Sequence, residues 1–470
     1  MTRRLLSAYR RLRATLAAHP QLVFILSTTA LFVLFDLVSL RNLDMDFGWH
    51  LQSGDYIRAH GIPAHDIFTY SARQFPWIDH EWGNDVIVSW LYGVGGYPLL
   101  AALYALLWSA GLVIAGVRAR FGVLLLAAFA MFPYAGIRPV AWTVLFLAIT
   151  LRLLHSKKRW IVWLLPLLFI PWANLHAGFV SALAIIAYIG WYERRPKLFG
   201  VFALSALATL INAYGPRLYV EIARTLFDPT LHSQVGEWHS FTFRLSALLF
   251  IAMWGAGGVL MEKRALKPWL RPSIPLLLAA MSATRNVPLF VVAAVQESSR
   301  YIDGILARVR LSGPVPNLGR IKAGAAIIAF GVLLLLAWQT FWPLNANRLA
   351  TYPQAAVAYL RANGCEDGNI FNDYNYGGYL IWKLPQQPVY IDGRMPSWKS
   401  PDGQKYMTRY YDLLSHPAQY RVLFARYNIR CALFQHTQLN AGLIARLLRD
   451  QWRPVINNKT YILLLAPDSK

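Results

Sequence analysis

Long apolar runs constrain this chain more than any other feature of its sequence. A run of about 20 apolar residues with few charges is long enough to cross a lipid bilayer as a helix. Two such runs are residues 21–40 and 323–341, and several more lie between them. Over the whole chain 56% of the residues are apolar and 15% are charged, whereas a typical soluble domain has about 25% charged residues. The sequence therefore predicts a polytopic membrane protein and excludes a single soluble core.

The connections between the apolar runs differ sharply in charge. Lys and Arg stay on the cytoplasmic side of a membrane, so alternate connections report the orientation. One set contains 23 Lys and Arg, and the opposite set up to Gln296 contains eight. We therefore expect a cytoplasmic N-terminus and, because about eleven spans is an odd number, an outside C-terminus. The predicted spans lie near 21–40, 96–117, 121–137, 140–154, 160–175, 178–192, 198–213, 244–261, 273–284, 286–302 and 323–341.

The excess of basic residues does not indicate a nucleic-acid partner. The 46 Lys and Arg against 23 Asp and Glu give a net charge of +23, but these residues are spread between the apolar runs instead of forming one patch. The basic N-terminus precedes the first run, and no small-residue cleavage site follows that run, so we expect an uncleaved helix. We predict a basic cytoplasmic segment at 1–20, followed by an all-α transmembrane domain at 21–341.

Residues 342–470 have the composition of a soluble domain. Charge returns, with 15 Lys and Arg and eight Asp and Glu, and the apolar runs shorten to strand length. Strands are predicted at 369–372, 389–392, 431–434, 454–456 and 460–465, with helices between them. This alternation predicts a small extracytoplasmic α/β domain. Asp373 and the pair Asp392 and Arg394 lie at the ends of predicted strands, where we favour turn formation over ligand binding.

The chain has only two cysteines, Cys365 and Cys431, and both fall in this domain. An oxidising compartment would allow a disulfide between them. The alternative is a pair of buried thiols, because free cysteine is among the most buried residue types. A Cα separation above about 7 Å would exclude the bond.

The first predicted outer loop, residues 41–85, is unusually long and polar. It contains three Trp, four His and seven of the chain's acidic residues. A loop of this kind is expected to be folded and to carry function. Its candidate site residues are Asp44, Asp46, His50, His80 and Glu81.

Other predicted outer ends of spans carry one or two polar residues each. They are Arg138 in GIRP, Asn174 and His176 in WANLH, Glu237 in GEWH, and Arg285 and Asn286 in TRNVP. Such groups are costly to bury unless they pair or line a wet site. Polar span ends occur in every membrane protein, but the cytoplasmic ends here are almost purely Lys and Arg. The set therefore favours a shared cavity on the outer side.

Several motifs resemble those of a known family. The chain has DMDFGWH after the first run, then GIPAHD and WIDHEW, and later WANLHAGF, INAYG and GEWH. Over about residues 20–340 this pattern resembles the bacterial GT-C membrane glycosyltransferases, and FNDYNYGGYLIWKLP with VYIDGR resembles the C-terminal domain of many members. The resemblance implies a transferase that uses a polyprenyl-phosphate-linked sugar, with the first outer loop supplying the acid that acts on the acceptor.

The residues themselves support the same chemistry. Inverting glycosyl transfer needs a carboxylate that takes the acceptor's proton and positive charge that neutralises the departing phosphate. Asp44 or Asp46 is the candidate base. Arg138, Arg285 and His176 are candidates for phosphate contact. Alternatively, the D-x-D pair shares a divalent cation such as Mg²⁺ or Mn²⁺, with His50, His80 or Glu81 completing the coordination.

A transporter or flippase of a lipid-linked glycan is the competing hypothesis. Transporters usually bind substrate near the bilayer midplane, whereas the polar residues here gather at one face. We therefore predict an enzyme at the outer face of the bacterial inner membrane, with a glycan, lipid or protein as acceptor. No motif specifies the sugar.

Overall fold

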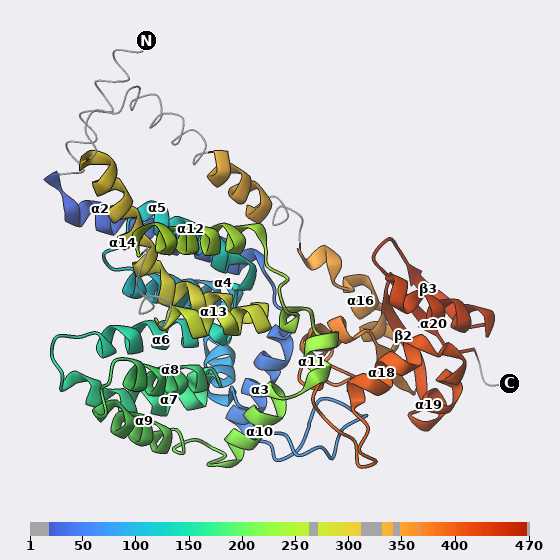
Figure 1. Cartoon of the computed structure of the whole chain (residues 1–470). Coiled ribbons are helices and arrows are strands. Elements are labelled where there is room, and N and C mark those ends of the chain that lie inside the picture. The colour runs from blue at the N-terminus through green and yellow to red at the C-terminus, as the bar shows by residue number, and fades with distance from the viewer. Residues whose placement is uncertain (1–17, 263–270, 312–330, 342–347, 366, 468–470) are drawn as a thin grey trace, which may run out of the picture.

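A computed structural model describes residues 18–262, 271–311, 331–341, 348–365 and 367–467. Most of the predicted basic segment 1–20 lies outside the described residues. The Pro- and Gly-rich stretch 312–319 and the first part of the predicted span 323–341 also lie outside them. Figure 1 shows a large helical part that is followed, at the C-terminal end, by a smaller domain with a sheet.

The helical part contains a helix at every predicted span, because each apolar run is rich in residues that favour helices and lacks internal breakers over most of its length. Its helices are α2 (Pro20–Arg41), α3 (Phe47–His60), α4 (Trp82–Ala115), α5 (Phe121–Met131), α6 (Val140–Leu154), α7 (Leu165–Leu175), α8 (Phe179–Tyr192), α9 (Lys197–Ala208), α10 (Arg217–Leu226), α11 (Pro229–Gln234), α12 (Leu245–Met261), α13 (Ser273–Ser282) and α14 (Val287–Leu311). Short 3-10 helices are η1 (Phe132–Tyr134), η2 (Ile161–Leu164), η3 (Gly236–Trp238) and η5 (Thr284–Asn286), and a last apolar helix covers Gly331–Phe341.

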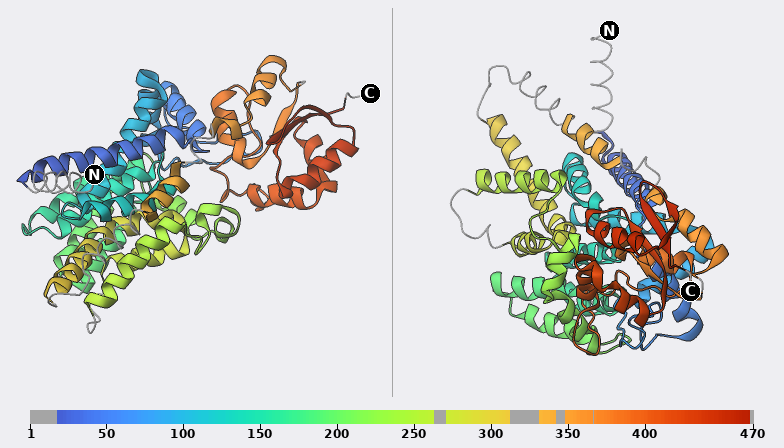
Figure 2. Two further views of the ribbon diagram at one scale, coloured as in Figure 1. Left: turned by 90° about the horizontal axis from the view of Figure 1, so that it is seen from above. Right: turned by 90° about the vertical axis from the view of Figure 1, so that its right-hand side faces the viewer.

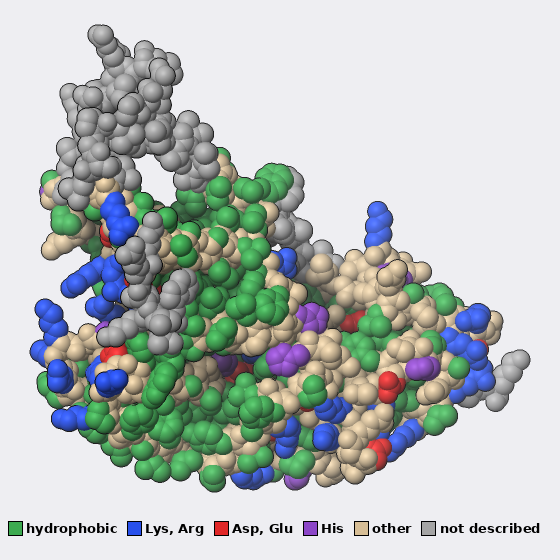
Figure 3. All heavy atoms as spheres, in the orientation of Figure 1, with side chains coloured by type: hydrophobic (Ala, Val, Ile, Leu, Met, Phe, Trp, Pro, Cys, Tyr) green, Lys and Arg blue, Asp and Glu red, His purple; other side chains and the backbone are tan. Residues whose placement is uncertain are grey.

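Two of the described helices, α2 and α4, are long and apolar enough by themselves to cross a membrane. Eight further apolar helices are shorter, so the number of eleven spans stays a prediction. The outer surface of the bundle is apolar: Leu167, Trp191 and Leu207 are each at least 60% exposed. Figure 3 shows hydrophobic side chains over much of the helical part. Apolar surface of this extent indicates contact with lipid.

Helix α4 divides into two segments at a glycine. Gly96 has φ +65°, a left-handed conformation that glycine adopts without steric cost, and Pro98 follows it. The predicted span at 96–117 therefore begins at this kink. The preceding turns, from Trp82, extend the first outer loop and pack against α3.

The C-terminal domain has a four-stranded mixed sheet in the order β1-β2-β4-β3. β1 and β2 are parallel, and β4 runs antiparallel to both β2 and β3. Helices lie around the sheet (Figure 2). The elements are η6 (Arg348–Thr351), α16 (Gln354–Asn363), β1 (Asn369–Asn372), η7 (Tyr374–Tyr376), α17 (Gly377–Lys383), α18 (Tyr406–Ser415), η8 (Pro417–Gln419), α19 (Tyr420–Arg426), β2 (Ile429–Gln435), α20 (Gln438–Arg449), β3 (Arg453–Asn457) and β4 (Tyr461–Leu465).

Cys365 and Cys431 form a disulfide, with their Cα atoms 5.5 Å apart. The bond joins the segment before β1 to β2. The two strands are parallel neighbours in the sheet, and Cys431 stands opposite Ile370. Of the two alternatives for these cysteines, the structure therefore has the bonded pair.

The predicted strand at 389–392 is wrong, because this segment does not join the sheet. The Asn372 side chain takes the place of a neighbouring strand: its Oδ1 accepts from the backbone N–H of Tyr390 at 2.8 Å, and its Nδ2 donates to the Ile391 carbonyl at 2.8 Å. The same segment also contacts the first outer loop, because Val389 makes an isolated parallel bridge to Thr69.

The first outer loop packs into the core of the C-terminal domain. Trp49, Ala72 and Trp77 belong to the same buried cluster as the strands of the sheet. Two hydrogen bonds extend this contact: the Ser71 hydroxyl donates to the Tyr390 carbonyl at 2.5 Å, and the Tyr70 hydroxyl donates to the Ile370 carbonyl at 2.8 Å. The loop is therefore fixed by the domain that follows the helical part.

Candidate functional site

A cavity of about 480 Å³ lies between one end of the helical part and the C-terminal domain. Histidine side chains are visible where the two parts meet (Figure 3). The volume falls in the range of small-ligand sites. Ten of the eleven predicted site residues line it: Asp44, Asp46, His50, His80, Glu81, Arg138, His176, Glu237, Arg285 and Asn286.

The D-x-D pair lies in the turn between α2 and α3, and its two acids differ in their contacts. Asp44 Oδ1 accepts from the backbone N–H of Asp46 at 2.9 Å, which closes the turn. Asp44 Oδ2 lies 2.7 Å from Nε of Arg138. The charge of Asp44 is therefore already matched by a guanidinium.

Glu237 in η3 lies between two arginines. Its Oε2 is 2.6 Å from Arg138 Nη2, and its Oε1 is 3.0 Å from Arg285 Nη1. Burial would raise the pKa of Glu237, but the two guanidinium groups outweigh burial and lower this pKa to about 2. Arg285 also stacks on the Trp238 ring at 4.8 Å. A chain of alternating charges thus runs from Asp44 through Arg138 and Glu237 to Arg285.

Asp46 stands apart from this chain. Within the described part of the sequence, the ion pairs at 4.0 Å or less do not include its carboxylate. Burial raises the pKa of Asp46, and the neighbouring charge of Asp44 raises it further, to about 7. Asp46 therefore exchanges a proton near neutral pH.

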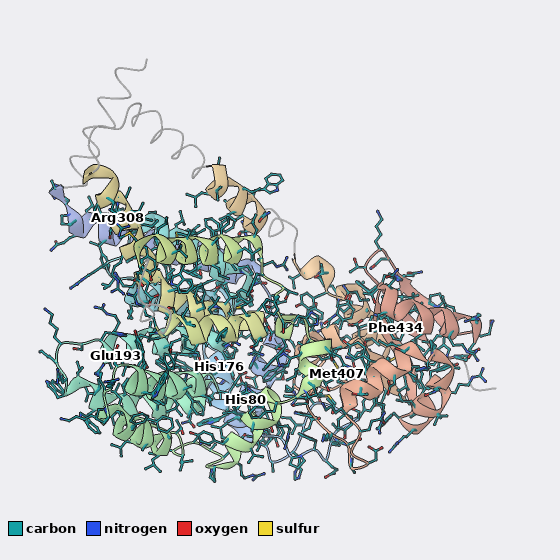
Figure 4. All side chains as sticks on the ribbon, viewed as in Figure 1. His80, His176, Glu193, Arg308, Met407 and Phe434 are labelled. Carbon is teal, nitrogen blue, oxygen red and sulfur yellow. A yellow bond between two sulfur atoms is a disulfide. The ribbon has the colours of Figure 1, made fainter. Side chains whose placement is uncertain are left out.

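Glu81, just before α4, is surrounded by three imidazoles. Its Oε1 lies 3.5 Å from Nε2 of His80 and 3.5 Å from Nε2 of His176. Its Oε2 lies 3.7 Å from Nε2 of His50. Figure 4 labels His80 and His176, which lie near each other on the side of the helical part that faces the C-terminal domain.

Two of these histidines, His50 and His176, differ in charge because their surroundings differ. Burial would lower the pKa of His50, but Asp85, whose Oδ1 lies 2.6 Å from its Nδ1, and Glu81 raise this pKa to about 9. Burial lowers the pKa of His176 to about 3 against the effect of Glu81. Its Nδ1 lies 2.7 Å from the Thr143 hydroxyl. At neutral pH the lining of the cavity therefore contains a charged His50 and a neutral His176.

No family model matches the sequence, and no curated protein matches it. Among solved structures, the chain is similar to ArnT from Cupriavidus metallidurans bound to undecaprenyl phosphate, with a TM-score of 0.54 and 12% identity over 95% of this chain and 98% of that one. The chain has the GT-C fold. It is also similar to the oligosaccharyltransferase of Archaeoglobus fulgidus tethered with an acceptor peptide, with a TM-score of 0.51 and 12% identity over 87% of this chain and 69% of that one.

In this GT-C fold, the predicted cation ligands do not form one ligand set. Among the described residues there is no group of three or more His, Cys, Asp and Glu that could hold a metal ion. Asp44 is paired with Arg138, so its charge is already balanced by a guanidinium. The described residues therefore do not fit a cation held by Asp44, Asp46 and His50.

Asn174 is the predicted site residue that does not line the cavity. Its Oδ1 accepts from the Trp82 indole N–H at 3.0 Å, and its Nδ2 donates to the Ile211 carbonyl at 2.9 Å. Asn174 thus connects α7 to α4 and to the end of the α9 region. Asn286 lines the cavity, and its Nδ2 donates to the Ala279 carbonyl at 3.0 Å.

The C-terminal domain contributes a wall of the cavity that sequence reasoning missed. Asp373 and Asp392 cap turns, as we predicted: each accepts from a backbone N–H two residues later at 2.9 Å. Yet neighbours of these turns reach the cavity. The glycines of GGY and DGR were the available signal, because glycine marks close backbone approach. The lining residues from this domain are Tyr374, Gly378, Gly393, Arg394, Pro396, Ser397 and Trp398.

Proposed function

We propose that this protein is an integral-membrane glycosyltransferase that transfers a sugar, with inversion, from a polyprenyl-phosphate-linked donor to an acceptor at the outer face of the bacterial inner membrane. The observation that carries the proposal is the cavity itself. It combines a carboxylate with a pKa near neutrality, Asp46, with two guanidinium groups, Arg138 and Arg285. The similar ArnT structure is bound to undecaprenyl phosphate, which supports a lipid-phosphate donor here.

In this proposal Asp46 is the general base. A base works best when its pKa lies near the operating pH, and burial with Asp44 brings the pKa of Asp46 to about 7. Asp46 takes the proton of the acceptor hydroxyl as that oxygen attacks the anomeric carbon. Asp44 has a different role, because its contact at 2.7 Å orients Arg138.

The arginines stabilise the leaving group. As the bond between the anomeric carbon and the phosphate oxygen breaks, negative charge grows on the lipid phosphate. The Arg285 side chain is about one third exposed, and its Nη1 pairs with Glu237, so further N–H donors remain for phosphate oxygens. Arg138 and the protonated His50 add positive charge nearby.

A transporter or flippase of a lipid-linked glycan remains the alternative. The polar groups of the cavity lie at helix ends and in loops, next to a folded C-terminal domain. This arrangement supports an enzyme over a carrier whose site opens to either side.

The test is to purify the protein from membranes, analyse the co-purifying lipids by mass spectrometry and assay transfer from a synthetic polyprenyl-phosphate sugar. We expect a bound polyprenyl phosphate and release of the lipid phosphate in step with glycoside formation. Movement of the intact lipid-linked sugar across a vesicle membrane, without cleavage, would establish the transporter instead.

A further inference from the structure

The candidate base packs directly on a turn of the C-terminal domain. Gly393 lies so close to Asp46 that a Cβ on this glycine would be 1.9 Å from Asp46 Oδ1 and 2.8 Å from its Cγ. No real Cβ tolerates such a distance. The carboxylate of Asp46 therefore occupies the space that any other residue at position 393 would need.

Two further glycines bring the same segments together. A Cβ on Gly378 would be 2.1 Å from the Met45 carbonyl oxygen, and a Cβ on Gly48 would be 1.9 Å from the Gly378 carbonyl oxygen. The turn before α3 and the start of α17 thus meet backbone to backbone. These two contacts fix the backbone on either side of Asp46 against the C-terminal domain, next to the contact at Gly393.

An ion-pair network holds the turn at Gly393 in place. Arg394 Nη2 lies 2.8 Å from Asp66 Oδ1 in the first outer loop and 2.6 Å from Asp392 Oδ2. The Arg394 side chain is only 3% exposed and stacks on the Trp77 ring at 4.5 Å. Removing one partner of such a buried pair leaves an uncompensated charge, so the network fixes the loop and the turn relative to each other.

We infer that the turn Asp392–Arg394 is a positioning element for Asp46, so that the C-terminal domain sets the geometry of the site through Gly393. This inference rests on the proposed function for the identity of the base. The turn does not touch substrate in this role. It acts by excluding water from one side of the Asp46 carboxylate and by holding it toward the cavity.

The charged and titratable groups around Asp46 come from several elements, and all of them bear on its titration. Asp44 and His50 face it from its own turn and from α3, and Glu237 faces it from η3. Arg138, before α6, and Tyr374, in η7, also interact with its charge. A substitution at Gly393 changes none of these groups. A shifted pKa of Asp46 in such a variant therefore reports a change in the position or hydration of its carboxylate.

The experiment compares Gly393→Ala with Gly255→Ala, a matched change in α12 where the new Cβ meets nothing within 4 Å. For Gly393→Ala we expect kcat to fall by about 10²-fold, the cost of a displacement near 1 Å, with the KM for the donor within threefold. In the Asp46→Asn background, Gly393→Ala should add little, because a double-mutant cycle reveals action through a shared residue. Gly255→Ala should behave as wild type.

A second readout does not depend on transfer. Difference infrared spectroscopy follows the carboxyl band that Asp46→Asn removes, with an expected wild-type midpoint near pH 7. Hydration of the carboxylate in Gly393→Ala should lower this midpoint. A shifted midpoint in a protein without transferase activity overturns the function and retains the positioning. An unshifted midpoint with kcat within threefold of wild type overturns the positioning and retains the function. If Gly393→Ala does not fold, Arg394→Lys is measured in the same way, and an unshifted midpoint in that folded variant again overturns the inference.

Discussion

Arg138 and Asp44 form an ion pair with 2.7 Å between Nε and Oδ2, and this contact separates the roles of the two acids in the D-x-D pair. The paired acid already has a partner for its charge. The other acid, Asp46, lies two residues further on and is held by close packing instead. Chemistry that needs an available carboxylate is therefore assigned to Asp46.

Asp46→Asn should reduce sugar transfer by about 10²–10⁴-fold, the usual cost of losing a general base. The amide keeps the size of the side chain but cannot accept the proton. Turnover is measured with a polyprenyl-phosphate sugar, and circular dichroism checks the fold. Asp412→Asn, an exposed acid on α18, is the control. Turnover within threefold of wild type in Asp46→Asn would falsify the assignment.

The pH dependence of kcat/KM should report the same group. Asp46 must be deprotonated to act as base, and its pKa is about 7. The rate should therefore rise tenfold per pH unit below this value and level off above it. A profile that is flat between pH 5 and pH 8 contradicts the role of Asp46.

The sequence predicted the helices and most of the C-terminal elements, because apolar length and the alternation of patterns are local properties. It placed ten site residues at outer ends that meet in one cavity. It could not pair Arg138 with Glu237, since 99 residues separate them. The failure at 389–392 has another cause: a side chain, Asn372, satisfies backbone groups that the pattern assigned to a strand.

Arg285→Lys should raise the KM for the donor about tenfold, with a smaller effect on kcat. Lysine keeps the charge but loses the planar set of N–H donors that matches phosphate. Steady-state kinetics against donor concentration measures the effect. Arg120→Lys, on the surface in a pair with Asp303, is the control, and an equal change in both variants argues against a phosphate contact at Arg285.

Cys365→Ser should lower the free energy of unfolding of the C-terminal domain. The bond closes a loop with a sequence separation of 66 residues, which contributes about 4 kcal/mol on chain-entropy arithmetic. Thermal unfolding with and without reductant measures this. Wild type should become less stable in reductant, whereas Cys365→Ser should not respond. Equal behaviour of the two proteins would count against the disulfide.

Cysteine labelling in intact cells tests the predicted orientation. Cysteines introduced at the exposed positions His60 and Lys459 should react with an impermeant maleimide, and one at the exposed Lys158 should not. The native cysteines are bonded to each other and should give no background. Labelling at position 158 from outside would reverse the topology.

The hydrogen bond from Ser71 to Tyr390 joins residues 319 positions apart, and this separation has a consequence for biogenesis. At synthesis rates of about 5–20 residues per second, the loop waits roughly 15–60 s for its partner. During that interval the acidic loop lacks the strands that complete its core. The cavity therefore forms last, after the C-terminal domain has been synthesised. A nascent or truncated chain carries the acidic residues of the cavity but lacks the turn at Gly393 that packs on Asp46.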